Sequence, residues 1–188
     1  MAVSVIPFQM PEPAAIPEHI TGHLRQMPAE AAMRRGMELL MQIEVAHLML
    51  WERVDGEGRL HLQEVLSKEG SPEQIRERLS AEPFYGQPVI EAASGLAGRA
   101  FEAGQPLLIM GQQAAGEEPE LPPALAAHLL PEGAGNVGFL YVLTLADGDG
   151  PPLGALTLVR PASEGPLNHE QPNITEAMRR LLSQILAA

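Results

Sequence analysis

The 188-residue sequence contains no cysteine. Without a thiol the chain forms no disulfide, offers no thiolate nucleophile or thiol redox chemistry, and holds neither an iron–sulfur cluster nor a thioether-linked cofactor. Lysine is almost absent too: the chain has eleven arginines but a single lysine, Lys68. This removes most candidates for a Schiff-base lysine. We interpret the arginine bias, in a chain rich in Ala, Gly and Pro, as the codon usage of a GC-rich bacterial genome.

Positive charge is scarce overall. The formal net charge is −12 and the sequence pI is about 4.9. This field repels phosphate backbones and anionic lipid surfaces, and no basic cluster offsets it. The pairs Arg34-Arg35 and Arg179-Arg180 are isolated, and we expect them to lie on solvated helix faces. The sequence therefore predicts neither nucleic-acid nor membrane binding.

Long hydrophobic runs are also missing. The longest runs reach about ten residues, whereas a membrane span needs roughly 20. No basic residue precedes Arg25, so the N-terminus lacks the charged start of a secretory signal. With 45% hydrophobic and 19% charged residues, the composition is that of an ordinary globular protein. We expect a cytoplasmic protein.

The first 28 residues differ in composition from the rest. Prolines recur there with few periodic apolar residues, which predicts an extended, loosely held arm. Within it, the spacing of Ile16, Ile20 and Leu24 favours a short helix over Glu18–Gln26. We therefore divide the chain into a Pro-rich arm, residues 1–28, and one domain, residues 29–188.

From residue 29 onward, periodicity and turn signals predict a definite order of elements. The order is a helix from Ala29 to about Glu44, a hairpin of Val45–Val54 and Arg59–Leu66, helices at Pro72–Ala81 and Ser94–Gly104, a strand at Leu107–Met110, a long connection with a short helix at Pro122–Leu130, strands at Gly138–Leu145 and Gly154–Val159, and an amphipathic helix to Ala188. Ser71 and Ser94 are typical helix N-caps, and Gly104 suits a left-handed C-terminal position. A connection as long as residues 111–136 is often a lid.

Two of these stretches resemble signatures of the GAF domain family. The middle stretch is Gly95–Phe101 followed by Gly104–Ile109, and the closing stretch is Val137–Leu145 followed by Leu153–Leu158. The resemblance covers residues 29–188 in the expected order. It implies an α+β fold with a central antiparallel sheet, the N- and C-terminal helices on one face, and short helices with a lid-like insertion enclosing a pocket on the other. A PAS- or profilin-like relative is the alternative fold.

The chain departs from the family in several ways. Without cysteine it cannot attach a bilin covalently or reduce methionine sulfoxide with thiols, as some family members do. The Asn-Lys-x-Phe-Asp-Glu type of signature, associated with cyclic-nucleotide binding, is missing. We expect no output domain after Ala188 or before Ala29, so the signal would pass to a separate protein.

Four residues are candidates for ligand contacts. Phe139 and Tyr141 share one face of their strand and would stack a planar ligand if that face lined the pocket; core packing is the alternative. Arg99 would pair with a carboxylate or phosphate, unless it is simply exposed to solvent. His128 belongs to the lid helix. We predict no metal site, because neither His47 nor His61 belongs to a ligand pair.

Two functions remain open. The first is a non-enzymatic, stand-alone sensory or regulatory domain that binds a small molecule of unidentified chemistry, since no catalytic triad, P-loop or carboxylate pair is present. The second is a dimerisation or adaptor module without a ligand. Either would act as a homodimer through the apolar stripes of the terminal helices. The predicted interface residues are Met33, Met37, Met41, Met178, Leu182 and Ile185.

Overall fold

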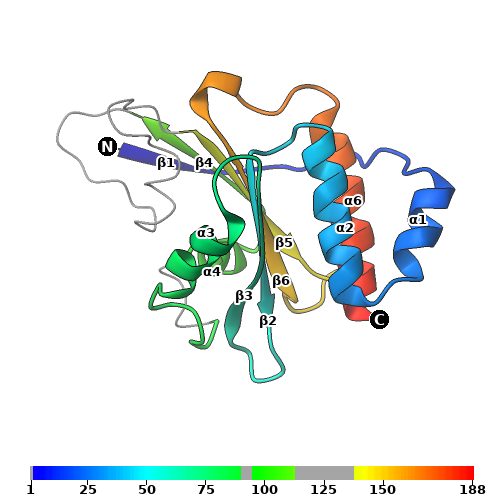
Figure 1. Ribbon diagram of the computed structural model, residues 1–188, viewed down its shortest axis with the longest axis horizontal. Helices are drawn as coiled ribbons and strands as arrows, with labels where there is room; N and C mark the ends of the chain where they lie inside the picture. Colours follow the sequence, from blue (N-terminus) through cyan, green and yellow to red (C-terminus); the bar gives the residue numbers. More distant parts are fainter. Residues whose placement is uncertain (1, 90–94, 113–137) are drawn as a thin grey trace.

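A single antiparallel sheet organises the computed structural model, which describes residues 2–89, 95–112 and 138–188 (Figure 1). Across the sheet the strands run in the order β1-β4-β5-β6-β2-β3. Their bounds are β1 Ala2–Pro7, β2 Leu48–Val54, β3 Leu60–Ser67, β4 Leu107–Gln112, β5 Phe139–Leu145 and β6 Gly154–Arg160. Every neighbouring pair is antiparallel, which confirms the predicted fold class.

Helices cover both faces of this sheet. They are α1 Glu18–Arg25, α2 Ala29–Gln42, α3 Pro72–Ser80, α4 Leu96–Ala103 and α6 Gln171–Ala187, with a 3-10 turn η2 at Ala162–Glu164. Figure 1 shows α2 and α6 side by side on one face, which we call the helix face, with α1 beside them. The short helices α3 and α4 lie on the other, which we call the α4 face. This division is the one that the family resemblance implied.

Two helices begin or end at the capping residues that the sequence predicted. Ser71 Oγ accepts a hydrogen bond from Gln74 N and caps α3. Gly104 ends α4 in the left-handed conformation, with φ of 64°, which glycine adopts without steric cost. The predicted cap Ser94 and the predicted helix Pro122–Leu130 lie outside the described residues.

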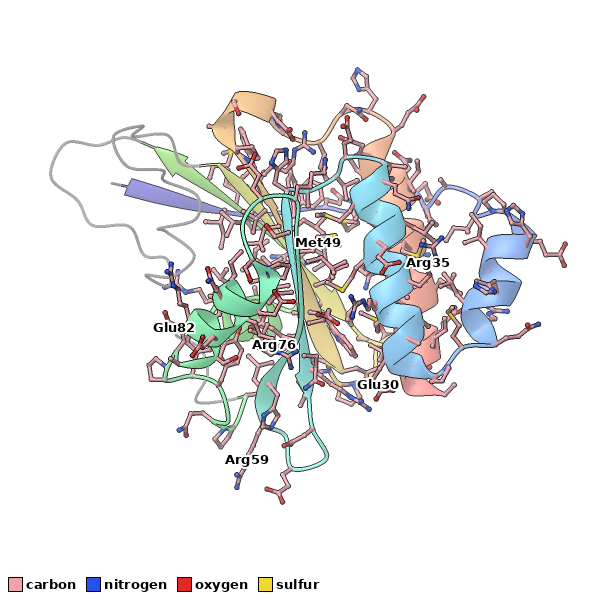
Figure 2. All side chains as sticks on the ribbon, viewed as in Figure 1. Glu30, Arg35, Met49, Arg59, Arg76 and Glu82 are labelled. Carbon is pink, nitrogen blue, oxygen red and sulfur yellow. The ribbon has the colours of Figure 1, made fainter. Side chains whose placement is uncertain are left out.

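The β2–β3 hairpin is also as predicted. The carboxylate of Asp55 organises its turn, because Oδ1 accepts from Glu57 N at 2.8 Å and from Arg59 N at 2.9 Å. Figure 2 shows Arg59 at the far end of this hairpin. A register shift opposite Trp51 and Glu52 leaves Gln63 unpaired and marks a bulge in β3.

The N-terminal arm differs from the expected loose terminus. Residues 2–7 form the edge strand β1, paired with β4 from Ala2 opposite Gln112 to Pro7 opposite Leu107. Farther along, Ala14 N donates to Asn173 O at 3.0 Å, which ties the arm to α6. The prolines had suggested a linker, but all of them follow Ile6 and only Pro7 belongs to the strand, as its last residue, so they leave its hydrogen bonding intact. The predicted short helix is confirmed as α1.

Each face of the sheet carries its own hydrophobic core. Side chains alternate along β5, so Tyr141 and Leu143 pack on the helix face while Leu140 and Val142 pack on the α4 face. The helix-face core contains Met33, Met37, Leu40, Met49, Trp51, Leu156, Leu158, Met178 and Leu182 among others. In Figure 2, Met49 lies at this interface between β2 and the helices. Within the described ranges, no helix is both long and apolar enough to cross a bilayer.

Candidate functional site

Two adjoining cavities flank α4. The large cavity has a volume of about 580 Å³ and is lined by Val54, Glu57, Gly58, Pro88, Val89, Gly98, Phe101, Glu102, Pro151 and Pro152. The small cavity, about 390 Å³, is lined by Ala100, Phe101, Gly104, Gln105, Pro106, Thr144, Ala146, Gly148, Asp149, Gly150, Pro152 and Arg179. Phe101 and Pro152 line both cavities, so the two adjoin along α4, between the β2–β3 turn and the β5–β6 turn, and we refer to them together as the hollow.

The residues of α4 explain why space remains here. Apart from Leu96, the buried residues of α4 are small, namely Ala97, Gly98 and Ala100, so the helix presents little side-chain volume towards the sheet. Small residues allow a close approach of backbones but cannot fill the space at the helix flanks. Phe101, which is half-buried, is the one large side chain of α4 that lines both cavities.

Beside this hollow, β2 carries a buried carboxyl group. Glu52 is 3% exposed, and its Oε1 accepts a hydrogen bond from the hydroxyl of Tyr85 at 2.7 Å. Its second oxygen, Oε2, is buried and has no partner among the described residues. Burial raises the pKa of Glu52 to about 7, and the Tyr85 hydrogen bond opposes that rise only partly. Burial and the nearby Glu52 raise the pKa of Tyr85 well above its usual value, so the phenol stays a donor.

Two threonines extend the polar character of this sheet face. Thr144 on β5 and Glu52 on β2 both pair with Ala155 of β6, so these three residues form one row across the sheet. Thr157 lies two residues beyond Ala155, on the same face. The Oγ1 atoms of Thr144 and Thr157 are buried without a partner among the described residues. Three unpaired polar atoms therefore gather on the face that α4 covers.

The predicted aromatic pair lies on the opposite side of the sheet. Phe139 and Tyr141 do share a face, but it is the helix face. The hydroxyl of Tyr141 accepts from Leu167 N at 3.0 Å, and its ring makes an edge contact with Phe8, 5.1 Å between centroids. Core packing therefore accounts for Tyr141, and neither aromatic residue lines the two cavities.

The other predicted contacts are only partly placed. Arg99 is half-buried on α4 and is not among the residues that line the two cavities. His128 lies outside the described residues. His47 contacts Glu164, and His61 Nε2 lies 2.7 Å from Asp55 Oδ2, so the two histidines are separate. Across the described ranges, no group of three or more His, Asp or Glu residues is arranged to hold a metal ion.

Most of the predicted dimer-interface residues are buried within the chain itself. Met33, Met37 and Leu182 are fully buried and Met178 is 4% exposed. Met41 and Ile185 are only half-buried and remain available at the surface. Association through the terminal helices stays a prediction, and Met41 and Ile185 are the members that a partner would reach.

The pair Arg179-Arg180 was expected on a solvated helix face, and this holds for Arg180, whose side chain is 57% exposed, but not for Arg179, at 18%. Both guanidinium groups bind the buried carboxylate of Glu176: Arg179 Nε lies 2.7 Å from Oε2, and Arg180 Nε lies 2.5 Å from Oε1. Desolvation of Glu176 would raise its pKa, but the two arginines outweigh it and hold that pKa below its usual value. Arg179 Nη1 also donates to Thr144 O at 2.8 Å, which joins α6 to β5 beside the small cavity.

Sequence reasoning missed Glu52, Thr144 and Thr157. A signal for Glu52 was present, because its position in Leu48–Val54 has the same parity as Leu48 and Leu50. A charged residue at an inward position of a strand is either paired or functional. The sequence did not show that Tyr85 donates a hydrogen bond to Glu52 or that α4 covers this face of the sheet.

Sequence comparison and structural comparison give different results. No protein-family model and no curated protein matches the sequence. Solved structures do match the fold. The GAF domain region of a Geobacter sulfurreducens protein superposes with a TM-score of 0.58 at 18% identity, over 87% of this chain and 95% of that one. The GAF domain of an Acinetobacter phosphoenolpyruvate-protein phosphotransferase gives 0.58 at 10% identity, over 90% and 89%.

A further similar structure is an enzyme. Free methionine-R-sulfoxide reductase from Neisseria meningitidis, solved in complex with its substrate, superposes with a TM-score of 0.55 at 13% identity, over 89% of this chain and 84% of that one. Identities this low establish the architecture and nothing finer. The chain has a GAF-like fold.

Proposed function

We propose that this protein is a non-enzymatic sensory or regulatory domain that binds a small molecule in the hollow along α4 and signals through a partner protein. Its GAF-like fold supports this class of function, because the similar structures are mostly GAF domains, and one of them is part of a methyl-accepting chemotaxis protein. The enzyme among them was solved with a small-molecule substrate, so the same architecture can enclose a compound of that size.

One observation carries the proposal. The two cavities, about 580 and 390 Å³, flank α4 over the sheet face where Glu52, Thr144 and Thr157 have buried polar atoms without partners among the described residues, and Thr144 lines the smaller one. Ligand sites typically combine a mainly apolar wall with a few convergent polar groups, at volumes of roughly 300–1,000 Å³. A buried polar group without a hydrogen-bond partner lowers the stability of the fold, and a ligand that supplies the missing hydrogen bond removes this cost.

A thermal-shift screen tests the proposal directly. A compound present at about 100 times its Kd stabilises the native state by roughly 2.7 kcal/mol, which is several degrees in Tm for a chain of this size. The variant Phe101→Trp, which enlarges the one large α4 side chain common to both cavities, should abolish that shift. Ile43→Trp adds the same ring at a site exposed beside α2 and should leave the shift unchanged.

Two results would count against ligand binding in the hollow along α4. One is a broad screen of metabolites, nucleotides and amines in which no compound raises Tm. The other is a compound whose shift survives Phe101→Trp, since it would then bind elsewhere. A ligand-free dimerisation module would give the first result, together with a dimer in light scattering.

A further inference from the structure

The chemistry around the hollow points to one class of ligand. We propose that it binds a small organic cation, with an apolar body against Phe101 and an amine or amidine group directed to Glu52. This inference rests on the proposed function and names the ligand class for that same site.

The charge of the wall is the first argument. Two carboxylates, Glu57 and Glu102, line the large cavity, and none of its described lining residues is basic. Glu57 contacts Arg59 at the surface, 3.1 Å between Oε2 and Nη2, at the exposed turn of the hairpin. The remaining lining residues are apolar or glycine. In the small cavity Asp149 offsets Arg179, which already binds Glu176. With a net charge of −12 on the whole chain, the local and the global field both favour a cation over an anion.

The second argument is the hydrogen-bonding state of Glu52. Its carboxyl group receives one donor, the Tyr85 hydroxyl, and Oε2 is left without any among the described residues. A buried carboxylate is stable only when donors or a positive charge compensate it. A protonated amine supplies both, because it carries the charge and up to three N–H donors. A carboxylate or phosphate ligand would instead place a second negative charge beside a buried acid.

The position of Glu52 in the sheet is the third argument. In its row, Thr144 lies on the far side of Ala155 and lines the small cavity, while Val54, two residues along β2 on the same face, lines the large one. Strands lie roughly 4.8 Å apart, so this row spans about 10 Å beneath α4. Glu52 itself lines neither cavity and lies between these two wall residues, so we expect the amine to approach its carboxyl group from the side of Val54.

Three probes of one shape separate the ligand classes. Benzylamine, benzyl alcohol and benzoate share an aromatic body and differ in being cationic, neutral or anionic at neutral pH. Calorimetry should show benzylamine binding, with the alcohol and benzoate at least about tenfold weaker because they leave Oε2 without a charged donor. Contact between the probe's ring and Phe101 is common to all three probes, so it cancels from the comparison.

Variants then assign the binding to Glu52. Glu52→Gln keeps an acceptor for Tyr85 but removes the charge, and should weaken benzylamine about tenfold or more. Glu102→Gln removes a carboxylate at the exposed rim and should weaken it only about two- to threefold. Circular dichroism on both variants establishes that they are folded.

Each result decides the matter. Equal benzylamine affinity in Glu52→Gln and the native protein overturns the inference, as does benzoate binding as tightly as benzylamine. Benzoate or benzyl alcohol binding that equals benzylamine in affinity and disappears in Phe101→Trp overturns the cation but supports the proposed function. Failure of all three probes also overturns the inference, while the broader thermal-shift screen decides the proposed function separately.

Discussion

The two faces of the sheet solve the problem of a buried carboxyl group in opposite ways. On the helix face, Glu176 is 1% exposed and is held by Arg179 and Arg180, so both oxygens have partners. On the α4 face, Glu52 is about as buried but has one neutral donor and an oxygen without a partner among the described residues. The carboxylate on the helix face is fully paired, whereas the carboxyl group on the α4 face lacks one hydrogen-bond partner and lies near the two cavities. This contrast favours stability as the role of the first face and binding as the role of the second.

Packing follows the same division. The helix-face core is filled by long side chains from α2, α6 and the sheet, several of them methionines that adapt to irregular gaps. It also has buried atoms without partners among the described residues, namely Trp51 Nε1 and the hydroxyls of Thr175 and Ser183. None of these is ionisable near neutral pH, and both hydroxyls lie on α6. The α4 face places small residues over an acid and leaves cavities at the helix flanks.

The largest expected effect is on the helix face. Leu182→Asp places a charge at a fully buried position packed against Gly36, so closely that a Cβ on residue 36 would lie 2.8 Å from a leucine methyl carbon. Loss of the apolar side chain and burial of a charge should lower the free energy of unfolding by roughly 5 kcal/mol, comparable with the whole stability of many domains. Urea unfolding followed through Trp51, the single tryptophan, measures it.

Ile185→Asp is the matched control one turn along α6. Ile185 is only half-buried, so the same charge should cost about 1–2 kcal/mol. Light scattering on this folded variant also tests the predicted dimer, which should dissociate if the terminal helices form its interface. A Leu182→Asp variant as stable as the native protein would show that the helix-face core is not what holds the fold.

A smaller effect of opposite sign is expected on the α4 face. The folded pKa of Glu52, about 7, lies above its ordinary 4.5, so the native state holds a proton that the unfolded chain releases between these values. Stability therefore falls as the pH rises from 4.5 to 7, and the full cost of roughly 3 kcal/mol is present above pH 7. Glu52→Gln resembles the protonated acid, so it should match the native protein at about pH 4 and exceed its stability by up to about 3 kcal/mol at about pH 8.

Urea unfolding at the two pH values measures this difference. Glu102→Gln, at the exposed rim of the same cavity, should change stability by less than about 0.5 kcal/mol at either pH. If the native protein and Glu52→Gln differ by the same amount in acid and in mild alkali, Glu52 does not hold an excess proton in the native state. If Glu52→Gln is more stable than the native protein and no longer binds benzylamine, Glu52 lowers stability and is needed for binding.

How much the sequence could predict differs between the faces for physical reasons. The helix face was predictable, because Met33, Met37 and Leu40 recur at helical spacing and that period directly reports which side is buried. The role of Gly104 was equally predictable, since the left-handed conformation at the end of a helix depends mainly on the residue at that position. The edge strand β1 was not, because its partner β4 begins about a hundred residues later and local proline content masked the pairing.

The site was harder to predict than the fold. Glu52 and Thr144 come from strands about ninety residues apart and meet only through Ala155 of a third strand. Glu176 was overlooked for another reason: the charged residues around it suggested a solvated helix face, whereas the arm and β5 cover that part of α6. A charged residue predicts a solvent-exposed position only when no oppositely charged partner is buried beside it.

The smallest of the three effects tests the paired carboxylate. Glu176→Gln removes the charge that binds Arg179 and Arg180 while keeping one acceptor, and should lower the free energy of unfolding by about 2 kcal/mol at neutral pH. The folded pKa of Glu176 lies below its ordinary 4.5, so this stabilisation is present above pH 4.5 and is lost as the pH falls below it. The native protein and the variant should therefore converge in acid, the reverse of the divergence that Glu52 produces towards alkaline pH.

Glu38→Gln is the matched control, because Glu38 also contacts two arginines, Arg34 and Arg35, but at the surface of α2. An exposed pair of this kind contributes less than about 0.5 kcal/mol. Equal losses in Glu176→Gln and Glu38→Gln would mean that burial adds nothing to the Glu176 cluster. The contrast between a satisfied acid on one face and an unsatisfied acid on the other would then rest on Glu52 alone, and its benzylamine affinity would be the deciding measurement.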